Sequence, residues 1–292
     1  MNDECLHLAK YWDTMQDQKV SCVLCPHRCT IPKNALGFCG IRKNIDGKLY
    51  AANYGRVSAL ALDPIEKKPL YMFHPGKFVL SIGGFGCNFY CPFCQNCEIS
   101  MEYEIRQQES ECFSPEQIVT LAKQTVPKGN IGVAYTYNEP LIGYEFLYDC
   151  AVLVHHAGLN NVIVTNGYIN QEPLEHLLPL IDAMNIDLKA FSDDFYKKLG
   201  GSLEAVKQTI SLAQKHCHVE ITTLIIPEEN EEEIEELAAW IASFNPEIPL
   251  HLTRFFPRHQ YADKMPTSRE TIYRLSEIAK KYLNNVFVGN MG

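Results

Sequence analysis

The chain has 292 residues, of which 46% are hydrophobic and 21% are charged, as is typical of a globular protein with a sizeable core. Its formal net charge of −9 argues against a general nucleic-acid binder. No apolar run reaches the roughly 18 residues of a membrane span, and the start of the chain lacks a signal-peptide pattern, so we expect a cytoplasmic protein.

Residues 1–77 are rich in cysteine and lack a strand–helix rhythm, so we expect them to form a separate small module. Twelve cysteines in a chain without an export signal favour metal ligands over disulfides. Within the module, Cys22, Cys25, Cys29 and Cys39 supply four thiolates. Such a group forms either a structural zinc site or an iron–sulfur cluster, and the spacing does not decide between them.

From residue 78 to 292, short apolar segments alternate with amphipathic helices. Most of these segments are continuous and rich in Val and Ile, as parallel strands buried on both faces are. We predict strands over 77–84, 130–137, 160–167, 184–190, 219–226, 249–256 and 284–290. The alternation predicts an α/β domain, either a barrel of βα units or a doubly wound sheet, and we favour the barrel.

Two helices have clear start signals. Ser114 precedes a proline and lies three residues before Gln117, which is the spacing of a capping box. Thr267 and Glu270 repeat this spacing, so we predict that a helix starts after Thr267.

Polar residues cluster at the carboxyl ends of several of the predicted strands. They are Asn138 and Glu139, Thr165 and Asn166, Asp187 and Lys189, and the stretch from Arg254 to His259. Barrels of βα units carry their sites at the carboxyl ends of the strands, so we expect these residues to border the site.

The loop after the first predicted barrel strand, GCNFYCPFCQNCEIS, contains Cys87, Cys91, Cys94 and Cys97. Thiolates gathered this closely select soft metals, and iron–sulfur clusters are characteristically held in this way. Three ligands on a four-iron cluster leave one iron open for chemistry. With Cys97 as a fourth ligand, the site would instead be a closed zinc or ferredoxin-like centre, and spacing alone leaves both possibilities open.

The C-x3-C-x2-C spacing resembles the signature of radical S-adenosylmethionine (SAM) enzymes, and GCNFYCPFCQN is similar to the subgroup related to pyruvate formate-lyase activating enzymes. Further stretches resemble the radical SAM member of the three-component AmmeMemoRadiSam set, which is named after its AMMECR1-like and Memo-like partners. These stretches are CVLCPHRC, GFCGIRKN, DPIEKKPLY, YTYNEP, VTNG and DLKA. The resemblance covers roughly residues 15–291 and implies a partial (β/α)6-type barrel.

The resemblance also implies a reaction. Cys87, Cys91 and Cys94 would ligate a [4Fe-4S] cluster, and the amino and carboxylate groups of SAM would chelate the open iron. Reduction by a donor such as flavodoxin or ferredoxin would release methionine and a 5′-deoxyadenosyl radical. This radical would abstract hydrogen from a small-molecule or protein substrate, as an oxidoreductase or an activating enzyme does.

Three residues have implied contacts with SAM near the cysteine loop. Phe93 matches an aromatic position beside the adenine, and the alternative is a hydrophobic anchor of the loop. Asn138 and Glu139 match a motif that binds the methionine amino group, where a carboxylate suits an ammonium. The alternative for this pair is a turn with a solvated carboxylate.

Five more residues are implied in cofactor binding. Asp187 and Lys189 resemble a motif whose lysine reaches the SAM carboxylate; their alternative is a structural ion pair at the strand end. Thr165 and Asn166 match a TNG motif after the third strand. His259 falls near a histidine at the end of the sixth strand, and its alternative is a surface position.

Two other classes of protein remain open at this point. In an iron–sulfur electron carrier, all the cysteines would close clusters, and Glu139 and Lys189 would have no ligand. A zinc-stabilised interaction protein on an inactive barrel would hold zinc at both cysteine groups.

Overall fold

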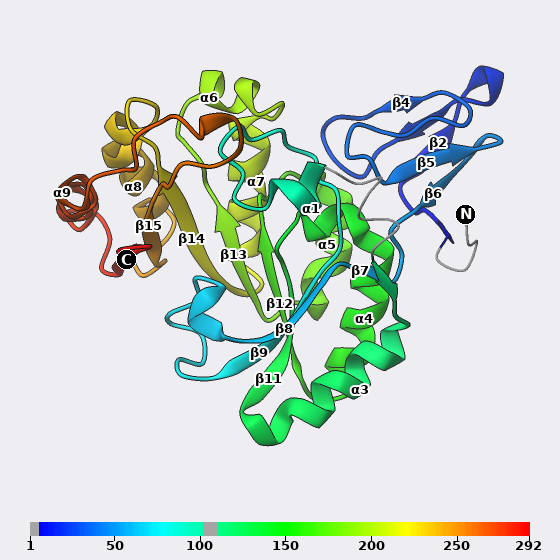
Figure 1. Cartoon of the computed structure of the whole chain (residues 1–292), viewed down its shortest axis with the longest axis horizontal. Coiled ribbons are helices and arrows are strands. Elements are labelled where there is room, and N and C mark those ends of the chain that lie inside the picture. Colours follow the sequence, from blue (N-terminus) through cyan, green and yellow to red (C-terminus); the bar gives the residue numbers. More distant parts are fainter. Residues whose placement is uncertain (1–5, 102–109) are drawn as a thin grey trace.

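The computed structural model describes residues 6–101 and 110–292. In this part of the chain, an eight-stranded sheet forms the centre of the molecule (Figure 1). Its parallel strands follow chain order: β9 (Phe78–Gly83), β11 (Asn130–Tyr135), β12 (Asn160–Thr165), β13 (Ala183–Asp187), β14 (His218–Ile225), β15 (Leu250–Arg254) and β16 (Val286–Gly289). All seven predicted strands are confirmed.

Strand β8 (Ala59–Pro64) pairs antiparallel with β9 at one edge of this sheet, and β16 forms the other edge. The sheet is therefore an open, partial barrel, as predicted. We placed residues 1–77 in one separate module, but β8 lies inside that range and belongs to the barrel sheet. The predicted boundary at residue 77 therefore lies too late in the chain, because β8 before it is part of the barrel sheet.

The helices that connect the parallel strands pack against the sheet. They are α3 (Pro115–Thr125), α4 (Tyr144–His156), α5 (Gln171–Leu177), α6 (Asp193–Lys198), α7 (Leu203–Ala213), α8 (Ile234–Ala242) and α9 (Arg269–Ala279), and the short α1 (Cys97–Met101) follows β9. Short 3-10 turns occupy Gln16–Gln18, Ile65–Lys67, Val126–Lys128, Pro140–Gly143, Leu178–Leu180, Glu231–Glu233 and His259–Tyr261. No described helix is long and apolar enough to cross a bilayer.

One predicted helix start is confirmed and the other is wrong by one residue. Ser114 caps α3, because its side chain accepts from Gln117 N and the Gln117 side chain accepts from Ser114 N. The cap of α9 is Ser268, whose hydroxyl accepts from Thr271 N at 2.9 Å. Thr267 instead donates its hydroxyl to the Ile225 carbonyl at the end of β14.

Most of the parallel strands bury both faces, whereas β16 at the sheet edge is only half-buried. Leu80 of β9 belongs to the large core that includes side chains of the covering helices, such as Ile118 of α3. Its neighbour Val79 belongs to a smaller core inside the barrel, together with Ile65 and Leu70. The continuous apolar runs therefore reflect burial on both faces, since side chains alternate between the two sides of a strand.

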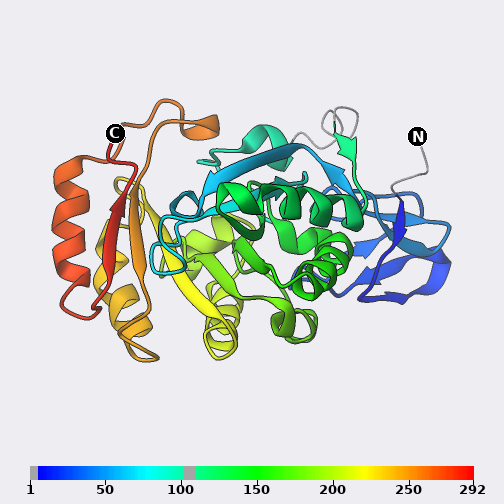
Figure 2. The same cartoon turned by 90° about the horizontal axis from the view of Figure 1, so that it is seen from below.

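The amino-terminal segment forms small antiparallel sheets at the opposite end of the molecule from α9 (Figures 1 and 2). One contains β1 (His7–Leu8), β6 (Lys48–Ala51) and β5 (Arg42–Ile45). The second contains β2 (Trp12–Thr14), β3 (Val20–Cys22) and β4 (Thr30–Ile31). A further pair joins β7 (Arg56–Val57) to β10 (Glu111–Cys112).

Candidate active site

A tight glycine turn leads from β9 into the cysteine loop. Gly86 has a φ of +84°, and a Cβ at this position would lie 2.7 Å from the Cys39 carbonyl oxygen and 2.8 Å from Ile41. Both the left-handed backbone and the close contact require glycine. Asn138 fixes the turn, because it accepts from Gly84 N and donates to the Gly86 carbonyl, each at 3.0 Å. The side chain of Asn138 is thus engaged by the turn itself.

Three thiols lie on the loop between this turn and α1. Cys94 N donates to the Cys91 carbonyl at 3.1 Å, and Phe89 N donates to Cys87 Sγ at 3.4 Å. Burial raises the pKa of the Cys91 thiol to about 12, and burial followed by the Glu139 carboxylate raises that of Cys87 well above its usual value. Thiols in this setting need a nearby cation, such as a bound metal group, to ionise.

The three thiols have the chemistry to hold an iron–sulfur cluster, because thiolates are the usual ligands of such clusters. Among the described residues, no group of three or more His, Cys, Asp or Glu side chains is placed to hold a single metal ion. That Cys87, Cys91 and Cys94 bind a [4Fe-4S] cluster stays a prediction.

Cys97 is the first residue of α1, and its side chain is half-buried. The helix returns to the start of the loop, because Gly86 N donates to the Ile99 carbonyl at 2.9 Å. Whether Cys97 completes a closed site stays a prediction, which the final experiment below tests.

Glu139 lies at the end of β11, buried and close to the cysteine loop. Its Oε1 accepts from Leu141 N at 2.9 Å and from the Thr165 hydroxyl at 2.7 Å, and its Oε2 accepts from Asn166 N at 2.8 Å. A carboxylate has about four acceptor positions, so one position on Oε2 remains for a ligand donor. Burial raises the pKa of Glu139 to about 7, although these hydrogen bonds lower it. A bound ammonium would favour its ionised form.

Asn166 and Asn88 connect Glu139 to the cysteine loop. Asn166 Nδ2 lies 3.8 Å from Cys87 Sγ and donates to Asn88 Oδ1 at 2.8 Å. Asn88 Nδ2 in turn donates to the Tyr168 carbonyl at 2.7 Å. We did not predict a role for Asn88. The sequence contains only one indication of such a role, which is that a polar residue stands between a ligand cysteine and an aromatic residue.

Asp187 and Lys189 lie at the end of β13 on the same side. Lys189 Nζ donates to Asp187 Oδ2 at 2.9 Å, and the Lys189 side chain is 15% exposed. Burial lowers the pKa of Lys189, but the Asp187 carboxylate outweighs it, so the net shift of the pKa is upward. The ammonium also lies 6.0 Å from the centroid of the buried Phe93 ring. The structure thus brings a permanent cation, the aromatic position and the cysteine loop together.

His259 begins a 3-10 turn after β15 that contacts the cysteine loop. Tyr261 N in this turn donates to the Pro92 carbonyl at 3.2 Å. His259 Nε2 is buried and has no hydrogen-bond partner among the described residues. A contact between His259 and SAM stays a prediction.

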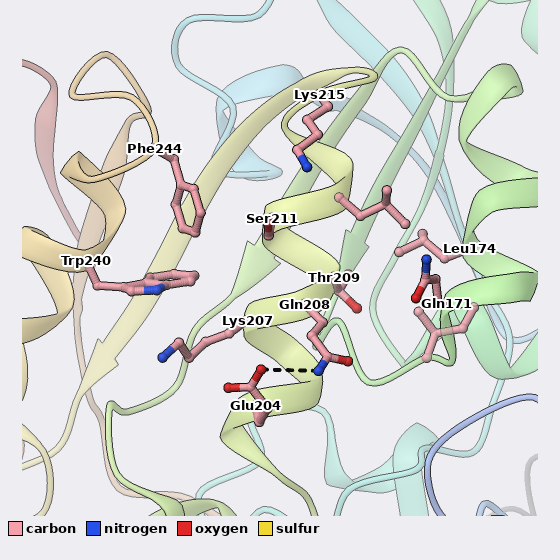
Figure 3. Close-up of a pocket in the computed structure, with 12 residues that line it drawn as sticks. Gln171, Leu174, Glu204, Lys207, Gln208, Thr209, Ser211, Lys215, Trp240 and Phe244 are labelled. Carbon is pink, nitrogen blue, oxygen red and sulfur yellow. Dashed lines mark hydrogen bonds between the residues drawn. The ribbon is translucent and has the colours of Figure 1, made fainter.

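A separate hollow lies on the outer helical face, between α5, α7 and α8 (Figure 3). Lys207 lies 5.2 Å from the Trp240 ring there, and Phe244 packs edge-on against that ring. None of the predicted site residues lines this hollow. The predicted residues gather instead at the carboxyl ends of the strands.

Comparisons with known proteins identify the family of the chain. The sequence model of the Radical SAM superfamily matches residues 81–241. The chain is 43% identical to an uncharacterised protein of Methanocaldococcus jannaschii over 97% of this chain and 85% of that protein. It is 28% identical to a putative glycyl-radical enzyme activating enzyme of the same organism, over 74% of this chain and 90% of the other.

Solved structures show the same fold. QueE from Escherichia coli matches with a TM-score of 0.54 at 14% identity, over 81% of this chain and 94% of that chain. At this level of identity, the likeness concerns the arrangement of strands and helices alone.

Proposed function

Because the chain belongs to the radical SAM superfamily, and is therefore an enzyme, we propose that it cleaves SAM reductively at a [4Fe-4S] cluster on Cys87, Cys91 and Cys94. When bound, the cluster supplies the electron that releases methionine and a 5′-deoxyadenosyl radical from SAM. The family implies both cofactors, whereas the ligand residues are our assignment.

The connection between Cys87 and Glu139 through Asn166 is the observation that carries this proposal. Asn166 contacts the cysteine sulfur with its side chain and the carboxylate with its backbone N–H. One acceptor position of a buried carboxylate is thereby fixed beside a cluster ligand. The primary amine of SAM, in its ammonium form, matches this position in charge and in hydrogen bonding.

Three further side chains would complete SAM binding. Lys189 supplies a cation for the SAM carboxylate, and Asp187 orients it through the 2.9 Å ion pair. Phe93 offers an apolar surface for the adenine. Its ring is buried against Phe195 and Tyr261, with centroids 6.0 Å away in both cases, so its position is fixed.

We infer the substrate class from the relatives. Similarity to proteins named as glycyl-radical enzyme activating enzymes supports hydrogen abstraction from a protein or a small molecule. The motifs in the amino-terminal half support membership of the AmmeMemoRadiSam set, with AMMECR1-like and Memo-like proteins as partners and a flavodoxin or ferredoxin as electron donor. Cys22, Cys25, Cys29 and Cys39 would hold zinc or an auxiliary cluster.

Anaerobic incubation of the reconstituted, reduced protein with SAM tests the proposal. We expect 5′-deoxyadenosine above the level of a control without enzyme, and none from the Cys91→Ala variant. If protein with a full complement of iron and sulfide forms no 5′-deoxyadenosine, the proposal is wrong. SAM binding would exclude the electron carrier, in which Glu139 and Lys189 have no ligand, whereas a colourless protein with zinc at both cysteine groups would establish the interaction protein.

A further inference from the structure

The four cysteines of the amino-terminal module line one small cavity. Cys22, Cys25, Cys29 and Cys39 all border it, although they come from separate strands and turns. Cys22 N donates to the Cys29 carbonyl at 2.9 Å, which holds two of the cysteines beside each other. The fold thus gathers four thiols around a common space.

A buried guanidinium borders the same cavity. Arg42 is 1% exposed, and its terminal nitrogens donate to Glu145 Oε1 at 2.8 Å and to the Ile142 carbonyl at 2.6 Å. Its Nε is also buried but has no partner among the described residues. A buried donor without an acceptor destabilises the folded protein, so an acceptor is expected beside it. The sulfur of a metal-bound group in the cavity would be such an acceptor.

The donor set suits an iron–sulfur cluster. Thiolates are the ligands of such clusters, and the cluster sulfurs accept hydrogen bonds. The buried Nε of Arg42, which has no partner in the described part of the chain, borders the cavity and would donate to a cluster sulfur. Four thiolates also suit a structural zinc ion, so the metal analysis below distinguishes the two.

This cavity also lies against the cysteine loop of the barrel. His27, between Cys25 and Cys29, places Nε2 2.8 Å from the carbonyl of Asn88, the residue that follows Cys87. On the other side, the Cys39 carbonyl packs directly against Gly86, so closely that a Cβ on Gly86 would lie 2.7 Å from the carbonyl oxygen. The two groups of cysteines are therefore joined by a hydrogen bond and by direct backbone packing.

We propose that Cys22, Cys25, Cys29 and Cys39 hold an iron–sulfur cluster at which the electron for the reaction enters the protein. The role of this cluster in electron entry rests on the proposed function. A low-potential carrier of the flavodoxin or ferredoxin class loses one electron, and the amino-terminal cluster gains it. No covalent bond forms or breaks in this step. The hydrogen bond between His27 and Asn88 connects the amino-terminal cluster site to the cysteine loop of the barrel, to which the electron passes next.

Metal analysis of the full-length C87A/C91A/C94A variant tests the identity of the site. After anaerobic purification, we expect iron and acid-labile sulfide, no stoichiometric zinc, and an EPR signal on reduction. Adding Cys25→Ala should remove the iron, whereas adding Cys217→Ala, a half-buried cysteine outside both groups, should not. Zinc in place of iron, or no metal in a variant that melts cooperatively, would overturn the proposal. If the variant fails to fold, Cys25→Ala in the otherwise intact chain must still lower iron per chain.

A comparison of reductants tests the entry role. In the Cys25→Ala variant, 5′-deoxyadenosine formation driven by reduced flavodoxin should fall about tenfold or more, while formation driven by titanium(III) citrate should stay at the wild-type rate. Equal losses with both reductants, or no loss with flavodoxin, would contradict an entry role. If the wild type forms no product even with titanium(III) citrate, the proposed function fails, while the metal analysis still decides the nature of the amino-terminal site.

Discussion

At the scale of single residues, the site depends on polar side chains that are buried and almost fully hydrogen-bonded. Glu139 accepts three hydrogen bonds, and two of them come from Thr165 and Asn166 on the neighbouring strand. These contacts hold the carboxylate in one orientation before a ligand binds. Binding then requires little rearrangement, which preserves affinity.

Replacing Glu139 with Gln should weaken SAM binding. The variant keeps the size of the side chain but loses a charge-assisted bond to the ammonium, which costs roughly 1.5–3 kcal/mol, or about ten- to a hundredfold in affinity. Equilibrium binding of SAM to the reconstituted protein measures the effect, and iron per chain should not change. Glu175→Gln, on the exposed face of α5, serves as the matched control. Unchanged affinity in Glu139→Gln would show that this carboxylate does not bind SAM.

Replacing Gly86 with Ala should destabilise the protein more than the same change at Gly158. Both glycines have a positive φ, but a Cβ at Gly158 meets nothing within 4 Å. Backbone strain alone should cost about 1–2 kcal/mol at Gly158, and contact with the Cys39 carbonyl should add about 1–3 kcal/mol at Gly86. Urea unfolding of the metal-free proteins gives both values. Equal costs would mean that the amino-terminal segment does not pack against this turn in solution.

At the scale of secondary-structure elements, a buried glutamate on β14 anchors the segment that leads into β9. Glu220 accepts from Tyr71 N at 3.0 Å and Met72 N at 2.8 Å, and it contacts His218 Nε2 at 2.9 Å and His251 Nε2 at 2.6 Å. Burial raises the pKa of Glu220, but these hydrogen bonds outweigh it and lower the pKa to about 2. One carboxylate thus links two strands and a loop.

Glu220→Gln should lower the free energy of unfolding by about 3 kcal/mol at pH 7, because the change removes a buried charge that several donors share. The pKa of Glu220 is lower in the folded protein than its usual 4.5, so its contribution is complete above about pH 4.5 and is lost as the pH falls towards 2. The difference between variant and wild type should therefore shrink in urea titrations at successively lower pH. A difference that grows on acidification would contradict the assignment.

Apolar patterns predicted the parallel strands, while long-range polar pairs could not be predicted. Strands β9 and β11 to β14 were visible because they bury both faces and so form runs of Val, Ile and similar residues, and the half-buried edge strand β16 carries a similar apolar run. An extended segment over 56–62 was expected, but the pairing of β8 with β9 was not. The Arg42–Glu145 pair was missed, since its two members are 103 positions apart. Nothing local in a sequence distinguishes a buried arginine from an exposed one before its partner is known.

At the scale of the whole molecule, the amino-terminal segment closes over the barrel beside the proposed site. Asn170, after β12, donates its backbone N–H to the Leu24 carbonyl at 3.0 Å and its side chain to the Val23 carbonyl at 2.7 Å. His27 and Cys39 contact the cysteine loop itself. We propose that this segment forms a distinct module, and that the barrel begins at β8.

The number of cysteines that bind the barrel cluster tests the central claim most directly, because SAM needs one iron free of protein. The measurement is the low-temperature EPR spectrum of the reduced Cys97→Ala variant with and without SAM, beside Cys87→Ala, Cys91→Ala and Cys94→Ala. We predict that Cys97→Ala keeps the cluster signal and that SAM changes it, whereas the other three variants lose the SAM-dependent signal. Loss of that signal in Cys97→Ala as well would mean a closed, four-cysteine site and would contradict the enzymatic account.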